Sequence, residues 1–136
     1  MDAGESELAL DAYTRAAGEQ GMTVDVLSAL GTANLGLGRL GQAETQLRKA
    51  IESDDAVPET WNNLGIVLLE KGETSEAVQM LKRAYALDNG ESDAIRDNLR
   101  LALEKLDQQA YAEDNQEQDY KLVRRGSGEY LIRQIP

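Results

Sequence analysis

Apolar residues recur at spacings of three and four along most of this chain, a pattern typical of amphipathic helices rather than strands. The pattern is clearest over Pro58–Asn89. A first helix is predicted over about residues 59–70, with the proline at its start, where a missing N–H costs no hydrogen bond. Gly72 predicts the end of this helix, because glycine readily takes the left-handed conformation that follows a helix. A second helix is expected to begin near Thr74 or Ser75, either of which can cap it.

The same pattern recurs one period of 34 residues earlier, where two further helices are predicted over about residues 24–37 and 42–53. Residue types match position by position between the two units. The matching positions are Leu27, Leu30, Gly31, Ala43 and Ala50 in the first unit, and Trp61, Leu64, Gly65, Ala77 and Ala84 in the second. We expect all of them to lie in the core. Glycine and alanine are expected where paired helices cross closely, because larger side chains would push the helices apart.

This residue set resembles the tetratricopeptide repeat, a helix–turn–helix unit that stacks into a solenoid. Residues 24–57 and 58–91 look like two complete repeats, residues 4–20 like the second helix of a half repeat, and residues 92–112 like a capping helix. Together they would form a repeat domain over residues 1–112. A lone second helix leaves half of its packing face uncovered. Either the chain is a piece of a longer protein, or a neighbouring chain covers that face.

The C-terminal part of the chain has a different pattern. Residues 113–119 are polar and acidic, and we expect them to form a linker. Within residues 120–136, two alternating segments flank Gly126-Ser127-Gly128, which predicts a β-hairpin. An isolated hairpin is marginal in water and should therefore dock on something. The sequence as a whole predicts an all-α tetratricopeptide-type solenoid with a short C-terminal β-hairpin tail.

Charge suggests where such a hairpin would dock. Residues 120–136 carry four basic side chains and one acidic, a net charge of +3. Because the whole chain has a net charge of −11, the rest of it carries −11 − 3 = −14. We expect the basic hairpin to sit on the acidic helical body or on a second copy of the chain. The overall negative charge argues against nucleic acid as a partner, because phosphate binding needs a basic face.

Composition excludes most chemistry. The chain has no histidine and no cysteine, which removes the commonest general base, the commonest metal ligand and every thiolate. We therefore expect no enzyme, no metal and no cofactor. Asp54-Asp55 is a dense carboxylate pair without the ligand spacing of a calcium loop, and we interpret it as surface charge. No window approaches the roughly 18 apolar residues of a membrane span.

The family resemblance implies where a partner would bind. In tetratricopeptide repeat proteins, the first helices of the repeats line a concave groove that receives an extended peptide or a partner helix. Mapped onto this sequence, the groove positions are Ser28, Thr32, Leu35, Asn62, Asn63, Ile66, Leu69, Arg96, Arg100 and Leu103. Chaperone-binding members grip a terminal carboxylate with basic and asparagine side chains at set positions. Only Asn63 matches that pattern here, so this mode of binding is not expected.

Arg96 and Arg100 are the basic residues of the mapped groove, one helical turn apart. Beside the polar and apolar groove positions of the second repeat, they would suit an acidic or amidic peptide with an apolar anchor. Alternatively, they pair with Asp93, Asp97 or Glu104 on their own helix. The sequence leaves both possibilities open.

Two short strings, Asn62–Gly65 and Ile95–Leu99, are also similar to bacterial tight-adherence (Flp) pilus assembly repeat proteins, which are periplasmic lipoproteins. That resemblance implies a role in pilus or secretion assembly and a periplasmic location after removal of a leader; a cytoplasmic location stays open. The predicted function is a non-enzymatic adaptor that binds a protein segment in the groove. The alternative is a self-assembling subunit, joined to its copies through the hairpin or the uncovered N-terminal helix.

Overall fold

The computed structural model describes residues 3–125. Within that range the chain forms helices and no strand: α1 (Ala3–Gln20), α2 (Val24–Gly36), α3 (Leu40–Ile51), α4 (Pro58–Glu70), α5 (Thr74–Leu87) and α6 (Asp93–Arg125). The predicted all-α fold is confirmed for these residues. The chain divides into two compact units, Met1–Ala102 and Leu103–Pro136. We call the described part of the first unit, residues 3–102, the repeat body.

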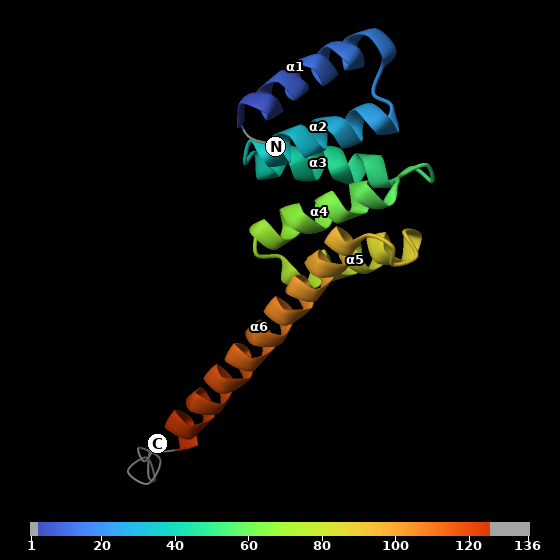
Figure 1. Ribbon diagram of the computed structural model, residues 1–136. Coiled ribbons are helices and arrows are strands. Elements are labelled where there is room, and N and C mark those ends of the chain that lie inside the picture. Colours follow the sequence, from blue (N-terminus) through green and yellow to red (C-terminus); the bar gives the residue numbers. More distant parts are fainter. Residues whose placement is uncertain (1–2, 126–136) are drawn as a thin grey trace. The chain divides into compact units, whose positions relative to one another are not determined.

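The repeat body is a stack of helices in which each of α1 to α4 packs on the helix that follows it in the chain (Figure 1). Helices α2 and α3 form one antiparallel pair, and α4 and α5 form the next. Gly38 and Gly72 end the first helix of each pair with φ of +75° and +83°. The backbone N–H of Glu73 donates to the carbonyl of Leu68 at 2.8 Å, which satisfies a carbonyl that the helix end leaves free.

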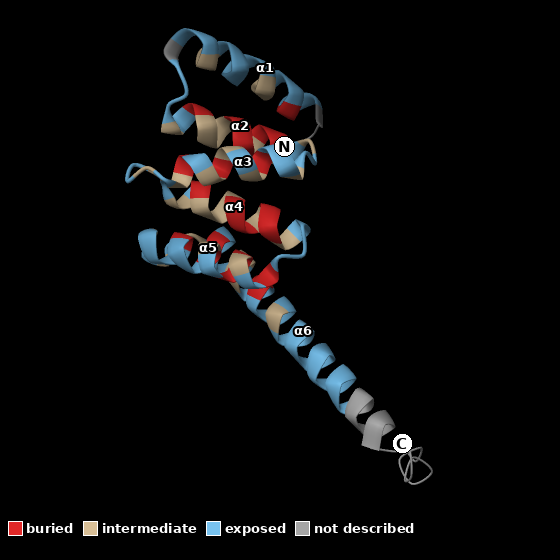
Figure 2. Ribbon diagram, turned by 180° about the vertical axis from the view of Figure 1, so that it is seen from behind, coloured by how far each residue is buried: buried red, intermediate tan, exposed pale blue. Residues whose placement is uncertain are grey.

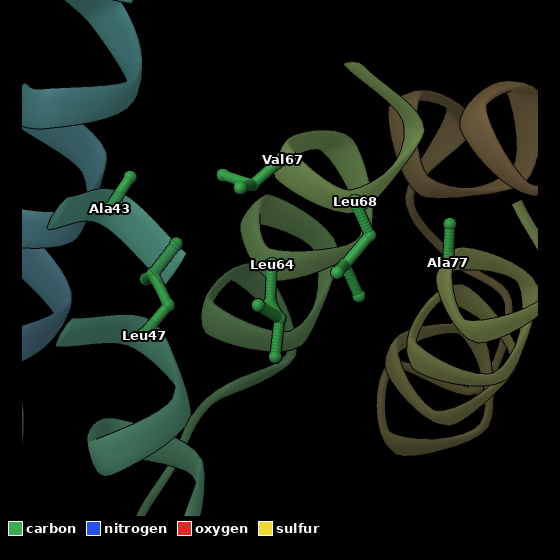
Figure 3. Close-up of a cluster of buried hydrophobic side chains, with 6 residues drawn as sticks. All are labelled: Ala43, Leu47, Leu64, Val67, Leu68 and Ala77. Atoms are coloured by element: carbon green, nitrogen blue, oxygen red, sulfur yellow. The ribbon is translucent and has the colours of Figure 1, made fainter. Parts of the chain in front are cut away.

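The core lies both within and between the helix pairs, and the buried positions of α2 to α5 form it (Figure 2). Its centre is a cluster of fully buried aliphatic side chains from α3, α4 and α5 (Figure 3). Its members are Ala43, Leu47, Leu64, Val67, Leu68 and Ala77. Burying one leucine contributes roughly 1.5–3 kcal/mol, so this cluster is the main source of cohesion between the repeats. Of the ten repeat-signature residues, Leu27 and Trp61 are half-buried and the others are buried.

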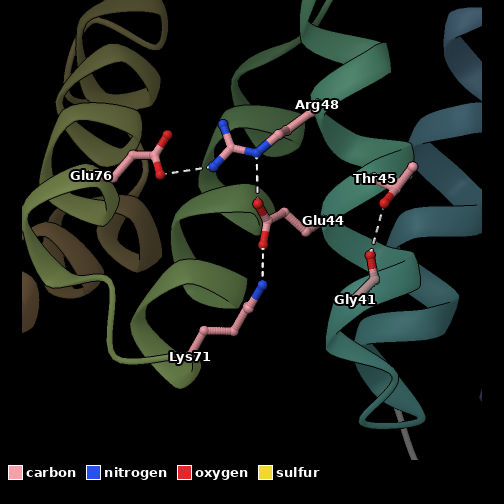
Figure 4. Close-up of polar contacts among 6 residues, drawn as sticks. All are labelled: Gly41, Glu44, Thr45, Arg48, Lys71 and Glu76. Carbon is pink, nitrogen blue, oxygen red and sulfur yellow. Dashed lines mark hydrogen bonds and ion pairs between the residues drawn. The ribbon is translucent and has the colours of Figure 1, made fainter.

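A chain of ion pairs joins the three helices around this core (Figure 4). Arg48 of α3 donates to Glu44 at 2.7 Å and to Glu76 of α5 at 2.8 Å. Lys71, just after α4, donates to the other oxygen of Glu44 at 2.5 Å. Hydrogen bonds from Lys71 and Arg48 hold the pKa of Glu44 below its ordinary value of 4.5. The hydrogen bonds to the two glutamates in turn raise the pKa of Arg48.

The C-terminal part of the chain differs from the sequence prediction. Helix α6 is continuous over Asp93–Arg125, so it extends past the predicted capping helix and through residues 113–119, which we expected to form a linker. The predicted β-hairpin is wrong, because residues 120–125 are helical where its first strand was expected. The rest of that hairpin, residues 126–136, lies outside the described residues.

The physical reason for the long helix is the composition of this segment. Residues 91–125 contain no glycine and no proline, and they are rich in Glu, Gln, Ala, Leu, Lys and Arg, which have high helix propensity. A helix satisfies its backbone hydrogen bonds within the segment, whereas a two-stranded hairpin of this length is marginal in water. The alternating apolar pattern was too short to outweigh these local preferences. Most described side chains of residues 103–118 are exposed, among them Tyr111.

Candidate functional site

One face of the repeat body carries a row of amide and hydroxyl side chains linked by hydrogen bonds. Asn98 Nδ2 of α6 donates to Asn62 Oδ1 of α4 at 3.0 Å. Asn62 Nδ2 lies 3.4 Å from Asn63 Oδ1, and Asn63 Nδ2 donates to Thr32 Oγ1 of α2 at 2.9 Å. Thr32 in turn donates to the backbone carbonyl of Ser28 at 2.9 Å. We call these five residues the polar row; it connects the first helices of successive repeats.

At the α2 end of the polar row, a cleft of about 300 Å³ opens between α1, α2 and α4. Three of the predicted groove residues, Ser28, Thr32 and Asn63, line it. The hydroxyl oxygens of Ser28 and Thr60 lie 2.6 Å apart in its wall and tie α2 to α4. Tyr13 of α1 also lines the cleft. The cleft therefore combines residues of the consecutive helices α1 and α2 with residues of α4, which lies about one repeat further along the chain.

The cleft is acidic. Asp25, Asp55 and Glu59 line it, and all three are exposed. None of the described residues that line the cleft is basic. Among the side chains that the structure describes, those of residues 4–19 and 21–118, no ion pair joins any of the three carboxylates to a basic group.

The arginines mapped to the groove have partners on their own helix. Arg96 lies 2.5 Å from Asp93, and Arg100 lies 3.9 Å from Asp97. Of the two possibilities that the sequence left open, the structure favours pairing within α6. Each of the two arginines therefore has a carboxylate of its own helix beside it.

The remaining mapped residues lie outside the cleft. Asn62 belongs to the polar row, and Ile66 is half-buried on α4. Leu69 is half-buried and packs against the core cluster. Leu69 therefore has a structural role that the mapping from the family did not anticipate.

Four of the residues that line the cleft were not singled out as site residues from the sequence: Tyr13, Asp25, Asp55 and Glu59. One signal was present. Asp25 and Glu59 are separated by one repeat period, and each lies in the first turn of its helix. Asp55 was interpreted only as surface charge, because nothing local showed that the loop before α4 meets α1 and α2.

The site contains hydrogen-bonding and charged groups suited to binding. Among the side chains that the structure describes, no group of three or more His, Cys, Asp or Glu could hold a metal ion. In the same residues, none of the helices has the length and apolar content required to cross a membrane. The polar row can exchange hydrogen bonds with a peptide, since each asparagine carries both donors and an acceptor.

Stacked helix pairs whose first helices present one continuous face define an α-helical repeat protein of the protein-interaction class. A family model described as "Tetratricopeptide repeat" matches residues 1–58 and 28–92. These matches span more than half of the chain, which therefore belongs to the tetratricopeptide repeat family.

The fold is also found in a solved structure, the crystal structure of the Sgt2 TPR domain from Aspergillus fumigatus. It matches with a TM-score of 0.73 and 22% sequence identity, over 79% of this chain and 72% of that chain. At this identity the likeness concerns the fold alone. A search of curated proteins gave no match.

Proposed function

We propose that this chain is a non-enzymatic adaptor that holds an extended segment of a partner protein along the polar row. The segment would lie across α2, α4 and the first turns of α6, with one end at the acidic cleft. The carrying observation is the row itself, in which hydrogen bonds link Asn98, Asn62, Asn63 and Thr32 across three helices.

Side-chain amides suit the recognition of an extended backbone. Each asparagine offers two N–H donors and a carbonyl acceptor, which match the acceptor and donor of a peptide unit. Because these side chains are already held by one another, they lose little conformational freedom when a segment binds. Amide and hydroxyl groups do not titrate near neutral pH, which favours binding rather than proton transfer as the task of this face.

The self-assembling alternative has less support. Its hairpin version no longer stands, because residues 120–125 are helical. Its other version relies on α1, where the exposed large apolar side chains are Leu8 and Tyr13, and Tyr13 lines the cleft. A single exposed leucine does not make an interface patch. We therefore favour the adaptor.

A role in bacterial pilus or secretion assembly is the process that we propose for this adaptor. It is supported only by the strings Asn62–Gly65 and Ile95–Leu99, which are similar to tight-adherence pilus assembly proteins. Identification of the partner tests this part of the proposal separately.

The adaptor is tested by affinity capture from a lysate of the organism that encodes the chain. Wild type is compared with Asn62→Ala/Asn63→Ala, and with Gln42→Ala/Gln79→Ala, which removes two exposed amides from the second helices α3 and α5. We expect a partner to be retained by wild type and by the glutamine variant, and lost by the asparagine variant. Thermal unfolding of both variants confirms that they are folded.

Other outcomes of this capture would contradict the adaptor. A partner retained equally by all three proteins would place binding away from the polar row. Recovery of further copies of the chain, with no other protein, would favour the self-assembling alternative. A captured component of a pilus or secretion system would support the proposed process, and an unrelated partner would overturn that part alone.

A further inference from the structure

We propose that the cleft between α1, α2 and α4 binds an arginine side chain of the partner, so that the adaptor selects positively charged segments. This inference rests on the proposed function and specifies the class of partner. It starts from the three carboxylates Asp25, Asp55 and Glu59, which line one cavity and form no ion pair with the described side chains of residues 4–19 and 21–118. Glu44 and Asp93 in the same body do have basic partners.

Stabilisation of the helix ends explains only part of this charge. Asp25 and Glu59 lie in the first turns of α2 and α4, where a carboxylate interacts favourably with the helix dipole. Each helix end contributes about half a positive charge. Two such ends against three carboxylates leave about two net negative charges at the cleft. Asp55, in the loop before α4, has no such structural explanation.

The other residues of the cleft suit a guanidinium group. Tyr13 supplies an aromatic ring, on which a cation can stack at up to about 6 Å from the ring centre. Ser28 and Thr60 supply hydroxyl oxygens whose remaining lone pairs can accept hydrogen bonds. Arginine has five N–H donors and no acceptor, and its planar fork pairs with carboxylates and stacks on rings better than lysine does. A cleft of about 300 Å³ is large enough to admit such a side chain.

The surrounding charges disfavour an acidic partner. Arg96 donates a hydrogen bond to Asp93 on its own helix, and Arg100 lies 3.9 Å from Asp97. An acidic segment would have to displace these pairs and would also meet the carboxylates of the cleft. A basic segment meets attraction at the cleft and leaves the pairs of α6 intact.

The test uses two fluorescein-labelled peptides, acetyl-Gly-Arg-Gly-Arg-Gly-amide and the same peptide with citrulline in place of arginine. Citrulline keeps the shape of arginine and removes its charge. Fluorescence anisotropy is measured with wild type, with the cleft variant Asp25→Asn/Asp55→Asn/Glu59→Gln, and with a control variant that neutralises three exposed glutamates away from the cleft. The substitutions of the control are Glu52→Gln, Glu70→Gln and Glu91→Gln. Both variants change the net charge by the same amount.

We expect wild type to bind the arginine peptide about tenfold more tightly than the citrulline peptide. The cleft variant should lose about tenfold in affinity, since three exposed ion pairs each contribute a few-fold, and the control variant should stay within about twofold. Tyr13→Leu, which keeps all the carboxylates, should lower the affinity for the arginine peptide a few-fold. Equal weakening by the cleft and control variants would indicate attraction to net charge and would overturn the inference. Equal affinity of wild type for the two peptides would also overturn the inference, as would no binding of either peptide below about 1 mM.

The same cleft variant separates this inference from the proposed function. In the lysate capture, loss of the partner from Asn62→Ala/Asn63→Ala but not from the cleft variant would keep the adaptor and overturn the arginine site. A partner retained by both variants would overturn the adaptor as well. Thermal unfolding of the cleft variant, compared with that of the control variant, checks that its loss of binding is not a loss of structure.

Discussion

A Cβ atom on Gly65 would lie 2.6 Å from Cγ of Leu81. The helices α4 and α5 therefore cross at a point where there is no room for any side chain but hydrogen. One repeat earlier, a Cβ atom on Gly31 would lie 2.5 Å from Cγ of Leu47. Both leucines are fully buried, so neither can move away without opening the core.

Gly65→Val should lower the free energy of unfolding by about 1–3 kcal/mol or more, because the added methyl groups overpack the crossing. Urea denaturation followed by circular dichroism measures the change. Gly41→Ala is the control, since nothing lies within 4 Å of a Cβ at that position, and it should be neutral or slightly stabilising. In the background of Leu81→Ala, the cost of Gly65→Val should shrink, which is the coupling expected of two residues in contact. Unchanged stability in the valine variant would contradict the close crossing.

Gly72→Ala should destabilise the protein by about 1 kcal/mol for a different reason. Nothing lies within 4 Å of a Cβ at Gly72, but its φ is +83°, a conformation that costs energy for any residue with a Cβ. Gly18→Ala, inside α1 and also without neighbours within 4 Å, should instead be neutral or stabilising. If thermal unfolding places the two variants at the same stability, the backbone argument for Gly72 fails.

The fold could be predicted from the sequence because its main determinants are local and repeated. Gly31 and Gly65, or Gly38 and Gly72, identify the repeat unit without knowledge of any distant contact. The cleft could not be predicted in the same way. Its carboxylates come from two helices and a loop, and only packing brings them beside Tyr13.

The long helix α6 was missed for another physical reason. Residues 113–119 contain no apolar residue, so they show no helical periodicity, and a polar segment was interpreted as a linker. Helix propensity and the absence of glycine and proline from residues 91–125 were the better indicators. An exposed helix needs no apolar stripe to satisfy its backbone.

Asn115→Pro tests this part of α6. A proline inside a helix costs about 3 kcal/mol and removes a backbone hydrogen bond. The magnitude of the negative circular dichroism signal at 222 nm should therefore become smaller. Asn115→Ala should keep or increase the signal, because alanine has the highest helix propensity. Identical spectra for the two variants would mean that residues 113–119 form the linker that the sequence predicted.

The pH dependence of stability should report the ion pairs of Glu44. Hydrogen bonds from Lys71 and Arg48 lower the pKa of this carboxyl below 4.5 in the folded chain. The stabilisation that this carboxyl gives the folded state is therefore fully present above the pKa that the carboxyl has in the unfolded chain. It is lost as the pH falls through the lower pKa that the carboxyl has in the folded chain. Above roughly pH 5, the free energy of unfolding of wild type should be about 1 kcal/mol higher than that of Glu44→Gln. This difference should shrink in more acidic solution.

Thr45→Ala serves as the control for this titration. Thr45 is exposed, donates only to the carbonyl of Gly41 within the described chain, and has no titratable group. The difference in free energy of unfolding between Thr45→Ala and wild type should stay constant with pH. A constant difference for Glu44→Gln as well would show that the ion pairs of Figure 4 do not contribute to folding.

The repetition of the glycine–leucine crossing also bears on how this array can change in length. Each crossing depends on one glycine and one leucine of the same helix pair, as in Gly31 with Leu47 and Gly65 with Leu81. A tandem copy of residues 58–91 would bring its own crossing, its own turn glycine and another first helix beside those that carry the polar row. Duplication of this segment in the gene would thus lengthen the array by one unit while leaving the existing helix pairs as they are.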